Sequence, residues 1–151
     1  MDDTDWAYLA GLLDGEGSFS LNGKIRYGKT GKPYNRFDAR ITVNQTTKPI
    51  IVWVSKIFTS NISFTQPNDF NKKGVYQVQT HKRQTIIFII NNILPYMRIK
   101  KAHAKLLLRY CLVRENKINK SKSLNSAKIG KQEMRIRDKL KILNGRGKGN
   151  T

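Results

Sequence analysis

Two carboxylates, Asp14 and Glu16, stand in the segment Leu9–Gly17, where a predicted helix reaches its carboxyl end. The free carbonyls and the negative end of the helix dipole disfavour carboxylates at this position. The chain has 29 Lys+Arg residues against 10 Asp+Glu, so cations for this place are plentiful. We therefore expect a positive group near Glu16. A hard divalent cation, held by carboxylate, carbonyl and water oxygens, fits that description.

Small residues recur every four positions along the same predicted helix, at Ala7, Gly11 and Gly15. Residues with this spacing share one helix face, and we call them the small-residue stripe. Because a glycine inside a helix costs about 1 kcal/mol relative to alanine, a closely packed partner backbone is the expected compensation. Packing within the chain, with a glycine C-cap, is the alternative explanation.

Other constellations of reactive residues are weak. Residues Gly23 to Thr30 fit the phosphate-loop pattern, but Gly31, Lys32 and Pro33 follow where that motif requires a helix to begin. His81 and His103 are far apart in the sequence and accompany one cysteine, Cys111, which argues against a zinc site. Cys111 lies among apolar residues and is predicted to be in the core.

The elements that position these residues follow from periodicity and from turn residues. Helices are predicted over residues 5–14, 48–58, 81–94, 99–115 and 127–143, and strands over residues 18–27, 34–45, 62–65 and 75–80. Residues 1–115 form the predicted core. A polar linker over residues 116–126, a basic helix and a flexible tail over residues 144–151 are expected to follow.

The predicted strands share one polar side. Alternation along each strand separates apolar residues from residues whose side chains donate and accept hydrogen bonds, as readout of base edges requires. We call this side the polar face; it comprises Ser20, Asn22, Lys24, Arg26, Arg36, Asp38, Arg40, Thr42, Asn44, Ser63, Thr65, Gln77 and Gln79. An ordinary solvated sheet would carry more acids, so this face is predicted to meet nucleic acid.

Charge supports the same partner. The formal net charge is +19 over 151 residues, and hydrophobic residues make up 38%, which is enough for a packed core. Double-stranded nucleic acid is the expected partner, with a general RNA-binding role as the alternative. No apolar run approaches the ~18 residues of a membrane span, and the acidic start is unlike a secretory signal, so no membrane partner is expected. One cysteine and many Lys, Ile and Asn residues suggest an intracellular protein, encoded by an organelle (chloroplast or mitochondrion) or acting in prokaryotic cytoplasm.

The segment Leu9-Ala10-Gly11-Leu12-Leu13-Asp14-Gly15-Glu16-Gly17 resembles the signature of the LAGLIDADG homing endonucleases. The resemblance continues in order to about Glu115. It implies an α+β fold with an αββαββα core, a saddle-shaped antiparallel sheet and helices on one side of that sheet.

The resemblance also implies the roles of individual residues. Glu16 would bind the catalytic metal, with the Gly15 carbonyl as a further ligand, and the ion would be Mg²⁺, for which Mn²⁺ substitutes. Gln45 matches a family glutamine that orients the attacking water, and Lys100 matches a family lysine near the scissile phosphate. Lys48, followed by Pro49, stands where single-motif relatives often have arginine.

One copy of the motif in a chain of this length implies a C2 homodimer in which Ala7, Gly11 and Gly15 meet their own copies. Such a dimer would cut both strands of a long, near-palindromic DNA and leave short 3′ overhangs. Each strand pair spans about 11 base pairs at ~3.3 Å per residue. An intron RNA maturase, with RNA as the partner, and a DNA-binding regulator that does not cleave are the alternatives on the same scaffold.

Overall fold

The computed structural model describes all residues except 71, 122–127 and 146–151. Its elements, in chain order, are α1 (Asp3–Glu16), β1 (Gly17–Tyr27), β2 (Pro33–Gln45), α2 (Lys48–Phe58), β3 (Ile62–Thr65), β4 (Val75–Thr80), α3 (Arg83–Ile93), α4 (Lys101–Ser121) and α5 (Lys131–Leu143). The predicted αββαββα core is confirmed by the order from α1 to α3.

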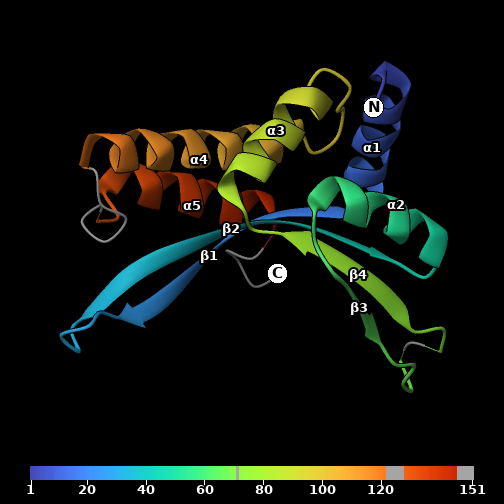
Figure 1. Cartoon of the computed structure of the whole chain (residues 1–151), viewed down its shortest axis with the longest axis horizontal. Helices are drawn as coiled ribbons and strands as arrows, with labels where there is room; N and C mark the ends of the chain where they lie inside the picture. Colours follow the sequence, from blue (N-terminus) through green and yellow to red (C-terminus); the bar gives the residue numbers. More distant parts are fainter. Residues whose placement is uncertain (71, 122–127, 146–151) are drawn as a thin grey trace.

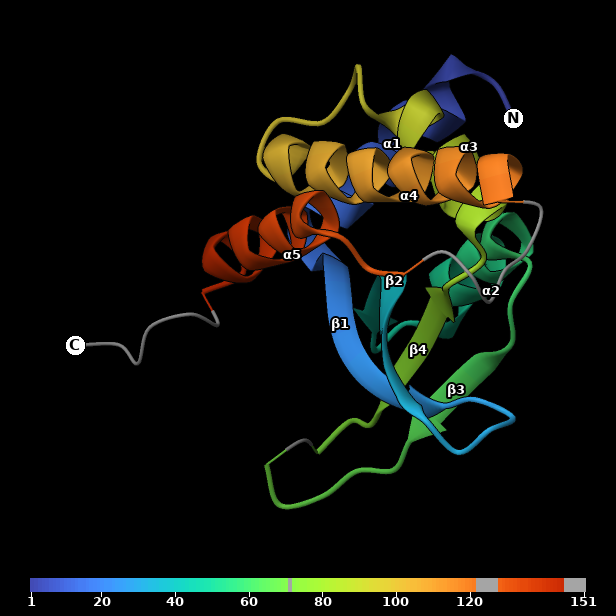
Figure 2. The same cartoon turned by 90° about the vertical axis from the view of Figure 1, so that its left-hand side faces the viewer.

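The four strands form one antiparallel sheet in the order β1-β2-β4-β3. Figure 1 shows this sheet as an arch, with one hairpin descending at each end and the helices on the opposite, upper side. In the view turned by 90°, the helices again lie on one side of the sheet (Figure 2). The saddle with helices on one side, expected from the resemblance, is therefore confirmed.

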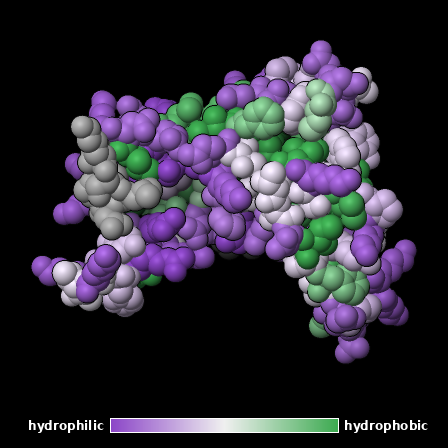
Figure 3. Space-filling view, in the orientation of Figure 1, coloured by the Kyte–Doolittle hydropathy of each residue, from purple (hydrophilic) through white to green (hydrophobic). Residues whose placement is uncertain are grey.

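Alternation along β2 separates the core from the polar face. Phe37, Ala39, Ile41 and Val43 are buried, whereas the residues between them are half-buried. The buried side packs beneath α1 to α4, which contribute apolar residues such as Leu13 to one core. Figure 3 shows hydrophilic residues along α4, α5 and the hairpin tips, and hydrophobic residues around α2 and α3.

Helix α5 is fastened to the rest of the molecule at both ends. At its start, the buried Glu133 accepts from the Gly130 N–H at 2.5 Å and pairs with Arg114 at 3.4 Å and Lys117 at 3.1 Å, both on α4. At its end, Asn144 Nδ2 donates to the Phe19 carbonyl of β1 at 2.9 Å. This basic helix thus packs against β1, which is an edge strand of the sheet.

Several boundaries differ from the sequence prediction. Helix α1 begins at Asp3 rather than residue 5, because Asp2 accepts from the Asp5 N–H and Asp5 accepts from the Asp2 N–H in a capping box. It also continues to Glu16. Residues 116–121, expected in the linker, extend α4, where Lys117 pairs with Glu133. The rest of that linker and residues 146–151 of the tail lie outside the described residues.

Two predictions about individual segments agree with the structure. The phosphate-loop match lies in β1 and the turn after it, and the next element is β2 rather than a helix. Cys111 is fully buried in the core, where burial raises the pKa of its thiol to about 12. In the described part of the chain, no helix is long and apolar enough to cross a membrane.

Candidate active site and nucleic-acid interface

The junction between α1 and β1 is a sharp, sterically fixed turn. A Cβ on Gly17 would lie 2.6 Å from Leu13 Cδ2 and 2.7 Å from the Leu13 Cα and carbonyl oxygen, so only glycine fits without a shift of the helix. The Gly17 N–H donates to the Leu13 carbonyl. Glu16 is consequently the last residue of the helix, and its position relative to the sheet is set by backbone packing.

Asp14 connects this junction to the start of α4. Its carboxylate is buried and accepts from the Arg98 N–H at 2.7 Å and the Lys100 N–H at 2.8 Å. Burial acts to raise the pKa of Asp14, but these backbone hydrogen bonds and the Lys100 charge outweigh it and lower the pKa below its ordinary value. Asp14 therefore holds the segment directly before α4 from a helix more than eighty residues earlier in the chain.

The sequence prediction left Asp14 without a role, although one signal was present. The segment before α4, Pro95–Lys100, contains no Ser, Thr, Asp or Asn that could cap that helix locally. This signal does not identify Asp14 by itself, since α2 and α3 form without a side-chain cap hydrogen bond.

Lys100 lies at the carboxyl end of α1 because Asp14 holds its backbone there. Its Nζ donates to the Gly17 carbonyl at 2.5 Å and lies 3.5 Å from the Gly15 carbonyl. These two carbonyls flank Glu16. The Lys100 ammonium thus lies on the carbonyls either side of Glu16 and offsets the negative end of the α1 dipole.

The donor set at this end of α1 suits a hard cation. The Glu16 carboxylate is exposed, and the neighbouring Gly15 contributes a carbonyl oxygen; oxygen ligands of both kinds are those that Mg²⁺ prefers. Among the described residues, no group of three or more His, Cys, Asp or Glu residues is placed to hold a metal ion. Because octahedral Mg²⁺ takes about six ligands, water, phosphate or a second chain would have to supply the remainder.

Gln45 ends β2 close to the same junction. In the sheet register, Val43 pairs with Gly17, and Gln45 follows two residues later, opposite Tyr76 of β4. Its side-chain oxygen accepts from the Thr46 N–H at 2.9 Å. Lys48 is exposed in the first turn of α2, three residues after Gln45.

The small-residue stripe is open on the surface of the described chain. A Cβ on Gly11 or Gly15 would meet nothing within 4 Å. Both glycines are exposed and Ala7 is half-buried. Packing within the described chain therefore does not explain the two glycines, and Gly17 rather than Gly15 is the residue that ends the helix.

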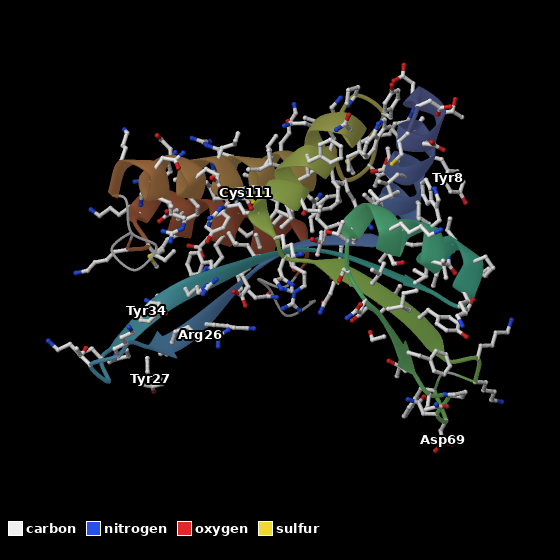
Figure 4. The ribbon with its side chains drawn as sticks, viewed as in Figure 1. Tyr8, Arg26, Tyr27, Tyr34, Asp69 and Cys111 are labelled. Atoms are coloured by element: carbon white, nitrogen blue, oxygen red, sulfur yellow. The ribbon has the colours of Figure 1, made fainter. Side chains whose placement is uncertain are left out.

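The strand register brings all predicted residues of the polar face to the same side of the sheet. Directly paired residues of antiparallel strands share a face, and the pairs here are Ser20↔Arg40, Asn22↔Asp38, Lys24↔Arg36, Thr42↔Gln79, Asn44↔Gln77 and Ser63↔Gln77, with Thr65↔Val75 beside them. Arg26 pairs with Tyr34, and Figure 4 shows the Arg26 side chain beneath the β1–β2 hairpin. This concave face is the candidate nucleic-acid interface.

Residues of the polar face differ in how accessible they are. Ser20 is buried at 7% exposure, so it is a weaker candidate for a base contact than the sequence suggested. Arg40 is half-buried, and its Nε has no hydrogen-bond partner among the described residues. Gln77 Nε2 donates to Asn44 Oδ1 at 2.8 Å, which joins β4 to β2 across this face.

Known proteins with the same fold were found by comparison. A family model described as LAGLIDADG endonuclease matches residues 9–112. The homing endonuclease I-CvuI, solved with the I-CreI target DNA and 2 mM Mg, superposes with a TM-score of 0.57 at 22% identity, over 94% of this chain and 96% of that chain. Another I-CvuI structure was solved with its target in 2 mM Ca.

More distant structures extend the comparison. The archaeal intron-encoded homing endonuclease I-Vdi141I, complexed with DNA, has a TM-score of 0.56 at 16% identity, over 95% of this chain and 99% of that chain. I-SmaMI, bound to cleaved DNA, has a TM-score of 0.61 at 16% identity, over 93% of this chain but only 43% of that chain. Comparison with curated protein sequences gave no significant match.

Because the family model covers more than half of the sequence and includes the α1–β1 junction, the chain belongs to the LAGLIDADG endonuclease family. The solved structures, all at low identity, share its fold. Membership in an endonuclease family agrees with the concave polar face and with the strongly basic composition.

Proposed function

We propose that this protein is a site-specific homing endonuclease that makes a metal-dependent double-strand break in a long, near-palindromic DNA as a homodimer. The observation that carries the proposal is the position of the Lys100 ammonium at the carboxyl end of α1, on the two carbonyls that flank the exposed Glu16. There an exposed carboxylate and an ammonium group lie beside the start of β1, next to the concave polar face. Family membership supports the same conclusion.

Within this proposal, Glu16 and the Gly15 carbonyl would hold a divalent cation, Mg²⁺ with Mn²⁺ as a substitute. When bound, such an ion supplies Lewis-acid stabilisation and an activated water. Lys100 would turn from the Gly15 and Gly17 carbonyls to the scissile phosphate and stabilise the charge that develops there. Gln45 would release the Thr46 N–H and orient the attacking water through its side-chain amide.

Asp14 acts in this scheme through Lys100. Its two backbone hydrogen bonds fix the segment before α4, so the ammonium group starts from one defined position. With its backbone fixed, Lys100 has fewer positions open to its side chain when the ammonium turns to the phosphate. Asp14 is therefore a positioning residue rather than a catalytic one.

The homodimer is proposed from the open small-residue stripe. Gly11 and Gly15 leave α1 without side chains on an exposed face, where another backbone can approach closely. A C2 dimer would place two copies of this face against each other and bring two Glu16 residues together, one for each DNA strand. Exposed Tyr8, which stacks edge-on against Trp53 at 5.5 Å, adds apolar surface on the same helix.

The cleavage proposal is tested with a randomised duplex library, incubated with Mg²⁺, Mn²⁺ or EDTA. We expect cuts with short 3′ overhangs at one near-palindromic sequence, with either metal and not with EDTA. Glu16→Gln should lose at least about a thousandfold in cleavage rate while keeping its affinity for the selected DNA. Asp138→Asn, the same carboxylate-to-amide change on the exposed side of α5, should cleave normally.

Three results would contradict the catalytic assignment. Undiminished cleavage by Glu16→Gln would remove Glu16 from the reaction. Sequence-specific DNA binding without cleavage by the native chain would support a regulator, and tight binding of structured intron RNA without DNA cleavage would support a maturase.

The dimer is tested separately by sedimentation equilibrium. Gly11→Leu should leave the fold intact, because open space surrounds that Cβ, but should convert a dimer into monomers. Asn116→Leu, on the exposed surface of α4, is the matched control and should remain dimeric. A native chain that is monomeric both alone and on target DNA would overturn the homodimer.

A further inference from the structure

Asp38 is the only carboxylate among the polar-face residues, and its neighbours are cations. Its side chain is 17% exposed and lies 2.8 Å from Lys24 Nζ and 3.8 Å from Arg36 Nε. We call these three residues the Asp38 cluster. A negative charge on a surface that meets phosphates opposes binding, so its presence there calls for a function.

Fold stability is a poor explanation for the Asp38 cluster. The Lys24 and Arg36 side chains are 43% and 60% exposed, and ion pairs between exposed side chains contribute about 0–1 kcal/mol. What the cluster does achieve is geometric restraint. Two long, flexible cationic side chains share one anchor that is itself well shielded from solvent.

The restraint leaves the outer donors of both cations available. Lys24 uses one of the three N–H donors of its ammonium group for Asp38, and two remain. Arg36 faces Asp38 with Nε, the inner nitrogen of its guanidinium group, so the terminal fork remains. Two donors on each restrained cation match the paired acceptors O6 and N7 that guanine presents in the major groove.

We propose that Asp38 is a positioning residue that holds Lys24 and Arg36 as readers of guanines at neighbouring base pairs in each half of the DNA target. The inference rests on the proposed function and adds a predicted feature of the target sequence. Lys24 and Arg36 are direct cross-strand partners. Their Cα atoms are thus about 5 Å apart, close to the ~3.4 Å step between base pairs, so neighbouring base pairs are within reach.

The electrostatics of the cluster are consistent with a permanent anchor. Burial acts to raise the pKa of Asp38, but the hydrogen bond and charge of Lys24, with Arg36 and Arg26 nearby, lower the pKa below its ordinary value. The carboxylate is therefore ionised at any pH at which the protein would bind DNA. An unrestrained lysine or arginine at this position would be drawn to the phosphates, which carry no sequence information.

The test is selection of bound duplexes from a randomised library in EDTA, so that no cleavage is needed. The native chain should select a G·C pair at two neighbouring positions of each half-site. Asp38→Asn should lower the guanine preference at those positions by roughly threefold to tenfold, as loosened but still present readers would. Asp138→Asn, which makes the same charge change on α5, should keep the native preference.

Lys24→Gln and Arg36→Gln keep the test decisive if Asp38→Asn does not fold. Both side chains are substantially exposed, so these variants should melt like the native chain. Each should lose guanine preference at one position, by roughly fivefold to a hundredfold. Selectivity at the other positions should stay unchanged.

Three outcomes would overturn the inference. In one, Lys24→Gln and Arg36→Gln weaken binding equally for all sequences, which would make them phosphate contacts. In another, a cytosine preference disappears in Asp38→Asn while guanine preferences persist, which would make Asp38 itself a reader. In the last, the native chain selects no sequence, which would overturn the proposed function and the inference together.

Discussion

The two hairpins of the arch have different chemistry on the same concave face. The β1–β2 hairpin, with strands of 11 and 13 residues, presents Lys24, Arg26, Arg36, Asp38 and Arg40. The β3–β4 hairpin, with strands of 4 and 6 residues, presents hydroxyl and amide groups from Ser63, Thr65, Gln77 and Gln79. We call them the charged arm and the neutral arm. Figure 4 shows Arg26 on one arm and Asp69 at the tip of the other.

The support behind each arm differs as well. The Tyr110 hydroxyl of α4 donates to the Phe37 carbonyl at 3.1 Å, and Arg137 of α5 lies 5.0 Å from the centre of the Phe37 ring. These contacts brace the charged arm from behind. The neutral arm has α2 behind it and an aromatic pair on its own strands, Phe64 and Tyr76, with ring centres 4.6 Å apart.

The difference indicates that the two arms contribute differently to DNA binding within one half of the target. Cations bind phosphates and guanines strongly but discriminate only when their positions are fixed, so a charged arm needs a rigid backing and an internal anchor such as Asp38. Hydroxyl and amide groups both donate and accept hydrogen bonds, so the neutral arm can discriminate bases with little effect on total charge.

The largest expected effect comes from neutralising the charged arm. Combined Lys24→Gln, Arg26→Gln and Arg36→Gln should weaken binding of the selected DNA by about a thousandfold, since three cation contacts are lost. Combined Ser63→Ala, Gln77→Ala and Gln79→Ala in the neutral arm should cost about tenfold and leave the salt dependence unchanged. Titration of labelled duplex at several salt concentrations measures both. Equal salt dependence of DNA binding in the two triple variants would contradict the assignment of phosphate and guanine contacts to the charged arm.

Loosening the brace behind the charged arm should have the next largest effect. Glu133→Gln leaves Arg114 and Lys117 without their buried carboxylate, so we expect a loss of about 3 kcal/mol in the free energy of unfolding. Urea denaturation measures it. Glu115→Gln, which breaks a partly exposed pair with Arg83, should cost about 1 kcal/mol or less. Similar losses in both variants would show that the buried Glu133 carboxylate stabilises the fold no more than the partly exposed Glu115 pair.

A smaller loss of stability is expected from a substitution of Asp14, which joins α1 to the segment before α4. Asp14→Asn keeps one acceptor but sets an amide N–H₂ against a backbone N–H, so it should cost about 1–2 kcal/mol in stability. It should also slow cleavage, because Lys100 loses its fixed position, while both arms keep their base preferences. A variant that cleaves at the native rate would contradict the positioning role.

The pH dependence of stability provides a second measurement on Asp14. The pKa of Asp14 is lowered in the folded state, so its stabilisation is present above the unfolded value near 3.8 and is lost as the pH falls through the folded pKa. The native chain should therefore lose stability below about pH 4. Asp14→Asn should show a shallower loss in the same range. Parallel pH profiles would exclude this contribution.

The smallest effect is expected at Cys111, in the core that both arms share. Because the thiol is fully buried and burial raises its pKa to about 12, it should not react with a thiol reagent in the native state and should react fully in urea. Colorimetric thiol titration measures this. Rapid reaction of the native protein would indicate that the core beneath the arms opens readily.

The sequence alone determined the strands, their two faces and the motif at the end of α1. Strand alternation has a period of two residues, so a few neighbouring residues, such as Phe37 to Val43, suffice to separate core from polar face. Likewise Gly11, Gly15 and Gly17 stand out locally, because glycine is costly in a helix and valuable at a close backbone approach. Each residue of the polar face was assigned to its side of the sheet in this way, although Ser20 is buried there.

Tertiary structure alone decided which distant residues meet. Asp14 binds the segment before α4, far along the chain, and Lys100 comes to the carbonyls beside Glu16. Glu133 of α5 pairs with Lys117 of α4. Asp38 meets Lys24 only because the β1–β2 register places them on neighbouring strands. Periodicity is a property of adjacent residues and carries no record of such pairings, which depend on how whole helices and strands pack to bury their apolar sides.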